Sequence, residues 1–146
     1  MAEQHVQSDL TAAAELAGLT AKRTALALAN LKLFKSDFTP TRDSVVGDFA
    51  AAEADFTGYA AVALSWSAVG IGADLRPTII STRAFFQATD AVTPNEIGGA
   101  WLETAAGALY EYWVFITPIS LSDALAYIGA VVTGQYPDAD DLDADY

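Results

Sequence analysis

The chain offers few side chains that could carry out catalysis. His5 is the only histidine, and there is no cysteine among the 146 residues. A catalytic triad or a histidine-bound metal would have to be built on His5, which stands in a polar N-terminal stretch. The lack of cysteine excludes disulfides, thiolate zinc sites and cysteine nucleophiles. We therefore predict a non-enzymatic protein with no catalytic residue, no cofactor and no metal ligand.

Carboxylates are abundant, because 19 acidic residues stand against 7 basic ones and the net charge is −12. Asp48 with Glu53 or Asp55 is the nearest approach to a glycosidase-like acid–base pair, but in acidic proteins such pairs are usually solvated. The C-terminal tail, residues 137–146, lacks the glycine and the distal glutamate of an EF-hand loop. We expect this tail to be disordered, since its aspartates repel one another.

Aromatic side chains are the other candidates for a binding site. Rings at strand spacing usually belong to a core or an interface, and a platform for stacking sugars is the alternative. The rings in question are Trp66, Trp101, Tyr110, Tyr112 and Trp113. Gly70 and Gly72 do not form a phosphate-binding loop, because no Lys-Ser/Thr pair follows them.

The charge balance argues against nucleic acid as a partner, since an acidic surface repels phosphate backbones. Lys32, Lys35 and Arg42 come nearest to a basic cluster, but Asp37 and Asp43 lie among them. We expect no nucleic-acid partner.

The hydrophobic share of 53% is high for a soluble chain. The uncharged stretch 56–73 approaches the length of a membrane span, but its glycines and its alternation suit strands better. No signal peptide is apparent, and we expect no membrane partner. We interpret the excess of apolar residues as surface buried against other copies or partners.

Strand patterns dominate from residue 25 onward. Residues 31–35 form one predicted strand, which Pro40 ends in a turn. A connection, 43–54, has a possible helical turn at 50–54. A second strand, 60–66, follows, and its residues Val62, Leu64 and Trp66 share one face. The further predicted strands are 79–88 in strict alternation, 100–104 and 109–118 as a hairpin around 105–107, and 124–133, with a loop at 90–99.

The arm 109–118 is apolar on both faces. Tyr110, Tyr112, Val114 and Ile116 share one face, opposite Leu109, Trp113 and Phe115. Such a strand is either central in a sheet or turns one face to a partner.

Short strands and the scarcity of helical patterns predict an all-β fold, an antiparallel, jelly-roll-like β-sandwich. We expect the sandwich domain to span 25–136 and to be preceded by an N-terminal arm or short helix, 1–24. Ser8 could cap a helix over 9–17, which Gly18 would end or weaken. Such an arm has too little apolar surface to form its own core, so we expect it either to fray or to dock on another surface.

Two stretches, LKLFKSDFTPT at 31–41 and EADFTGY at 53–59, resemble small β-sandwich virion structural proteins of tailed bacteriophages. The resemblance is sharpest over 31–66 and fades toward the C-terminus. It implies a capsid decoration or cement protein on the virion surface, with the major capsid protein as partner. It also implies a homo-oligomer, with a trimer favoured. Since fold motifs carry no functional residues, a tail-associated adhesin or carbohydrate-binding module stays open as the alternative.

Overall fold

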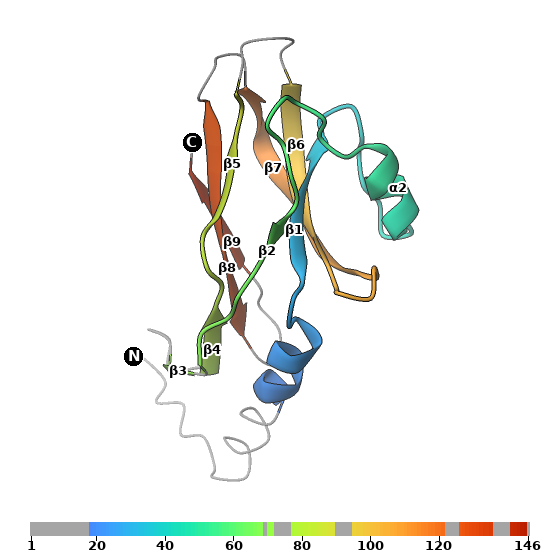
Figure 1. The fold of residues 1–146 in the computed structure, drawn as a ribbon. Coiled ribbons are helices and arrows are strands. Elements are labelled where there is room, and N and C mark those ends of the chain that lie inside the picture. Colours follow the sequence, from blue (N-terminus) through green and yellow to red (C-terminus); the bar gives the residue numbers. More distant parts are fainter. Residues whose placement is uncertain are drawn as a thin grey trace, which may run out of the picture.

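A computed structural model describes residues 18–68, 70–71, 77–89, 95–121, 126–135 and 141–145. His5 and the predicted helix 9–17 lie outside these residues. Two antiparallel sheets pack face to face (Figure 1), which confirms the predicted all-β sandwich. The strands and the labelled helix are β1 (Asn30–Lys35), α2 (Val46–Ala51), β2 (Val62–Ala63), β3 (Gly70–Ile71), β4 (Pro77–Ile80), β5 (Ala84–Gln87), β6 (Asn95–Glu103), β7 (Leu109–Leu121), β8 (Tyr127–Gln135) and β9 (Asp141–Asp145).

The first sheet has the strand order β2-β1-β6-β7. Its β6–β7 hairpin confirms the predicted pairing around residues 105–107, where Gly107 takes a positive φ of 85°. Two expectations for this sheet were wrong in detail. The predicted strand 60–66 pairs with β1 only over β2, and β6 begins inside the predicted loop 90–99.

Gly98 and Gly99 stand inside β6 because other backbone approaches too closely for a side chain. A Cβ on Gly98 would lie 2.7 Å from the Cα atom of Ser36, and one on Gly99 would overlap the carbonyl oxygen of Trp113. These glycines mark close approach within a sheet, not a loop.

In the second sheet, β8 is the central strand. β4 and β5 pair with successive parts of one edge of β8, and β9 pairs with the other edge. The predicted single strand 79–88 is therefore two strands. Ser81 lies at the break between them, where its hydroxyl accepts a hydrogen bond from the Val132 amide (2.9 Å).

This break overturns the strict alternation predicted for 79–88. Ile79, Ala84 and Phe86 are buried together, while Ile80 and Phe85 are exposed. The interruption shifts the phase by one position, so the residues before it change faces relative to those after it.

The segment after β2 joins the two sheets along one side of the sandwich. Ser67 donates its amide to the Ile80 carbonyl (2.8 Å), and Thr82 donates its amide to the Ser65 carbonyl (2.7 Å). Trp66 and Ser81 are bridge partners between these bonds. The strand predicted at 60–66 is short because it leaves the first sheet for the second.

Two apolar cores stabilise the fold. The larger lies between the sheets and includes Leu31, Leu33, Phe86, Leu102 and Ile128. The smaller lies under α2 against the first sheet (Figure 1) and contains Phe34, Phe49, Ala52 and Trp101. The helix predicted at 50–54 begins earlier than expected, because Asp48 accepts the Val45 amide (2.9 Å) and thereby fixes the first turn of α2.

The expectation of a disordered acidic tail is wrong for residues 141–145, which form β9. Asp141 is paired with Thr133 and Asp145 with Gly129, and the intervening Leu142 packs against the larger core. Side chains alternate between the two faces of a strand, so Leu142 can face the core although Asp141 and Asp143 flank it in the sequence. The edge of β8 supplies hydrogen-bond partners for the backbone of β9.

A helix at residues 18–25, here called the N-terminal helix, precedes β1 and lies at one end of the sandwich (Figure 1). Leu19 is fully buried and Arg23 donates a hydrogen bond to the Trp66 carbonyl (3.4 Å), so the segment 18–24, expected in the N-terminal arm, contacts the sandwich. Gly18 is the first described residue of this helix, and the helix predicted to end or weaken at Gly18 lies outside the described residues.

Candidate functional site

The carboxylates that sequence reasoning considered for acid–base chemistry have separate structural roles. Asp48 holds the first turn of α2, and Glu53 accepts a hydrogen bond from the Tyr59 hydroxyl (2.8 Å). Asp55 forms an ion pair with Lys35 (3.4 Å). The three side chains do not face a shared reacting position, so the structure does not assemble an acid–base pair from them.

Neither metal-ligand clusters nor membrane-spanning helices appear in the described part of the chain. Within it, no three His, Cys, Asp or Glu side chains come together in an arrangement that could hold a metal ion. Among the same residues, no helix has the length and apolar character needed to cross a membrane.

The aromatic residues that were candidates for a sugar platform are distributed over different parts of the fold. Trp101 is fully buried in the smaller core, where Tyr112 packs beside it. Trp113 and Trp66 pack against the larger core. These rings form no common exposed surface, which is what the core interpretation predicts.

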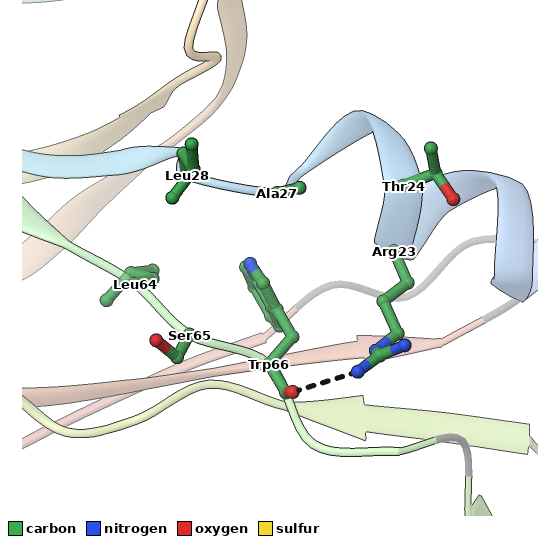
Figure 2. A pocket seen from close by; sticks show the side chains of 7 residues that line it. All are labelled: Arg23, Thr24, Ala27, Leu28, Leu64, Ser65 and Trp66. Atoms are coloured by element: carbon green, nitrogen blue, oxygen red, sulfur yellow. Dashed lines mark hydrogen bonds between the residues drawn. The ribbon is translucent and has the colours of Figure 1, made fainter.

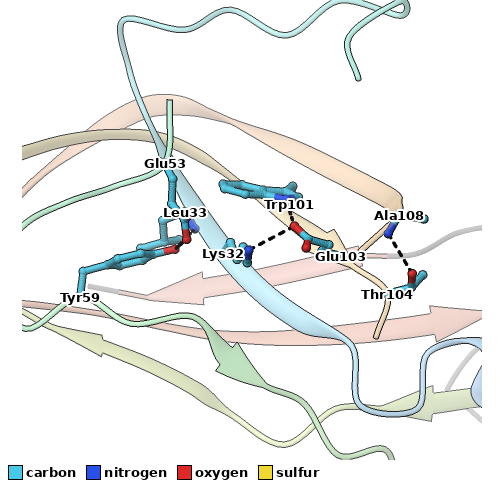
Figure 3. Close-up of polar contacts among 8 residues, drawn as sticks. All are labelled: Lys32, Leu33, Glu53, Tyr59, Trp101, Glu103, Thr104 and Ala108. Carbon is cyan, nitrogen blue, oxygen red and sulfur yellow. Dashed lines mark hydrogen bonds and ion pairs between the residues drawn. The ribbon is translucent and has the colours of Figure 1, made fainter. Parts of the chain in front are cut away.

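Polar contacts join β1, β6 and the segment 53–59 (Figure 3). Glu103 binds the Lys32 ammonium (3.2 Å) and the Trp101 indole N–H (3.3 Å). Tyr59 accepts the Leu33 amide (3.2 Å) and donates to Glu53. Burial, together with the neighbouring Glu53, raises the pKa of the Tyr59 hydroxyl well above its usual range. All these groups have hydrogen-bond or ion-pair partners within the fold, so we infer that they stabilise the folded state.

A hollow of about 390 Å³ lies between the N-terminal helix and the segment that joins the sheets. Figure 2 shows Arg23 reaching toward the Trp66 carbonyl oxygen, to which its guanidinium donates (3.4 Å). The Trp66 ring is fixed by its indole N–H, which donates to the Leu26 carbonyl (2.9 Å). Ala27, Leu28 and Leu64 supply apolar lining, and Thr24 and Ser65 supply hydroxyls.

Leu28 at this hollow has an unusual conformation. Its φ is +60°, in the left-handed region that costs a leucine about 1–2 kcal/mol. Its side chain is exposed, although Leu26 and Ala29 beside it are buried. The strain is explained by the sharp turn from the N-terminal helix into β1.

Exposed apolar side chains form two surfaces. The β7 surface consists of Tyr110, Val114 and Ile116, of which Ile116 is entirely exposed (104%). These residues belong to one of the two apolar faces predicted for 109–118, and β7 is an edge strand and not a central one. Tyr112, also predicted on this face, instead packs partly on the smaller core.

The second surface consists of Ile80, Phe85 and Tyr127, on the side of the second sheet away from the core. The Phe85 and Tyr127 rings are adjacent, with centroids 5.1 Å apart. Sequence analysis missed this surface, because strict alternation through 79–88 placed Ile80 and Phe85 on opposite faces. The serine- and threonine-containing run at 81–82 was the only signal of the break.

Comparison with known proteins gives no relative: no family model matches the sequence, and no curated protein and no solved structure is significantly similar to it. The phage resemblance therefore rests on the two motifs at 31–41 and 53–59.

Proposed function

We propose that this protein is a structural, assembly-forming component that works through protein–protein contacts and not through catalysis. The observation that supports this most is the pair of exposed apolar surfaces on a domain in which the candidate carboxylates Asp48, Glu53 and Asp55 serve the fold. Large exposed apolar residues gathered on a surface commonly mark contacts with other proteins.

More specifically, we propose a capsid decoration or cement protein of a tailed bacteriophage, bound to the major capsid protein on the outer face of the shell. The support is the resemblance of residues 31–41 and 53–59. In the structure these stretches are β1 with its following turn, and the segment that packs beside it through the Ala54–Leu33 hydrogen bond (2.9 Å). The motif pair thus describes one contiguous part of the fold.

The test is rebinding to particles. Capsids of the encoding phage, stripped of this protein, are mixed with the purified chain and pelleted. We expect the protein in the pellet when the stripped capsids are present and in the supernatant when they are absent. If it stays in the supernatant in both cases at physiological salt, the capsid role is wrong.

A carbohydrate-binding module, as in a tail adhesin, is the second candidate. The adjacent exposed rings of Phe85 and Tyr127 favour it, since paired aromatic rings can stack on a sugar. This candidate predicts that Tyr127→Ala abolishes binding to host-surface oligosaccharides in a glycan array. Absence of binding by the wild-type chain to every host oligosaccharide would exclude it.

A further inference from the structure

We propose that two copies of this chain associate through the free edge of β7, antiparallel and around a two-fold axis at Trp113. The inference deepens the proposed assembly role, since it rests on the proposal that this protein works through protein–protein contacts, and it does not require a capsid. It names both the contact surface and the partner, which is a second copy.

The first argument is that β7 ends its sheet. The strand order is β2-β1-β6-β7, and among the described residues no further strand pairs with β7. The Trp113 carbonyl points toward β6, because a Cβ on Gly99 would overlap it. Backbone groups alternate along a strand, so those of Tyr112 and Val114 point toward the free edge. This edge therefore offers donors and acceptors to another strand.

The second argument is that the edge complements itself. An axis at Trp113 places Val114 opposite Tyr112 of the second copy, and the outward backbone groups of these two residues can exchange hydrogen bonds. The exposed Val114 side chain thus meets an aromatic one, a cross-strand combination that stabilises sheets.

Other registers match less well. An axis at Tyr112 would place Val114 opposite Tyr110 of the second copy, whose ring already lies under its own Lys22 ammonium (5.9 Å). An axis at Glu111 would set two carboxylates against each other, and like charges directly opposite are destabilising.

The third argument concerns charge. A chain of net charge −12 repels its own copies, so association must use a region with few charges. β7 carries a single charged residue, Glu111, in 13 residues.

The edge is also limited in length. One residue of β6, Gly98, stands opposite the four residues 115–118 of β7, which form a bulge. Bulges stop edge pairing from continuing, so we expect a closed pair and not an extended sheet. Pairing of one strand edge buries much less surface than the roughly 800 Å² per partner of a standard interface, so the dimer should dissociate on dilution.

The experiment measures molar mass by light scattering on gel filtration over a hundredfold range of concentration. We expect the wild type to shift from monomer to dimer as concentration rises. Val114→Lys, at a side chain 56% exposed, should remain monomeric with an unchanged melting temperature. The matched control Ile80→Lys, 49% exposed on the other sheet, should dimerise like the wild type.

Hydrogen exchange adds a readout that other interfaces would not give. The Tyr112 amide should exchange more slowly in the wild-type dimer than in the monomeric Val114→Lys variant. Three results would overturn the proposal: a wild-type monomer throughout, a Val114→Lys variant that still dimerises, or a trimer. A trimer would agree with the stoichiometry that the phage resemblance implies. None of these results decides capsid rebinding, which a monomer or a trimer can perform.

Discussion

At the scale of single residues, Gly58 shows what the stretch ADFTGY does. Its φ is +98°, and a Cβ there would stand 2.6 Å from the Gln87 carbonyl oxygen. The neighbours Phe56 and Tyr59 face inward, toward the larger core. The glycine thus lets the chain turn against β5 while the aromatic residues anchor it, which gives the motif a structural role.

Gly58→Ala should therefore destabilise the protein. The left-handed backbone alone costs a non-glycine residue about 1–2 kcal/mol, and the overlap with the Gln87 backbone adds to it. Gly47→Ala is the matched control, because its Cβ would meet nothing within 4 Å in α2. It should stabilise the protein by about 0.5–1 kcal/mol. Urea unfolding measures both, and equal stability of the two variants would contradict this role of Gly58.

Tyr59 gives a prediction on pH. Its pKa is raised in the folded state above its unfolded value, so the fold favours the neutral hydroxyl. This contribution is fully present below the unfolded pKa of about 10 and is lost as the pH rises above that value. Urea unfolding between pH 8 and 11 should show this loss.

Tyr59→Phe is the comparison for this pH dependence. The variant should be less stable at pH 8, by about 1 kcal/mol for each hydrogen bond lost. It should also lose less stability than the wild type between pH 9 and 11. If both proteins lose the same amount over this range, Tyr59 is not the group responsible.

At the scale of elements, the sequence predicted strands better than their interruptions. β1, the β6–β7 hairpin and β8 follow from alternation and from the turn at 105–107. The division between β4 and β5 did not follow, because the Ser81 hydroxyl that bridges it acts through a contact with Val132, 51 residues away. Nor did the glycines of β6, whose neighbours come from β1 and β7.

The hollow and the surface around Phe85 were unpredictable for the same reason. Each depends on how segments distant in sequence meet, as Arg23 does with Trp66. The β7 surface was partly predictable, since it requires only the alternation of one strand.

β9 supports a prediction at this scale. Deleting residues 141–146 removes the strand that pairs with one edge of β8, together with the contact of Leu142 with the core. Full burial of a leucine contributes about 1.5–3 kcal/mol, and Leu142 is partly buried, so we expect a loss toward the lower end of this range. Thermal melting followed by circular dichroism measures it. An unchanged melting temperature would restore the interpretation of a solvated tail.

At the scale of the whole molecule, the sandwich combines a strongly acidic composition with apolar surfaces at β7 and on the second sheet. The acidity opposes nonspecific association between copies, and the apolar surfaces provide places for specific contact. Both properties suit a protein that must remain soluble before it is assembled into a larger particle.

The number of copies that bind per capsid tests the proposed capsid role most directly. Stripped capsids are titrated with the purified chain, and the bound protein is quantified against the major capsid protein after sedimentation. A decoration protein should saturate at a fixed ratio to the major capsid protein, and the ratio should be the same in independent preparations. Binding that never saturates, or no binding at all, would contradict the assignment to the capsid surface.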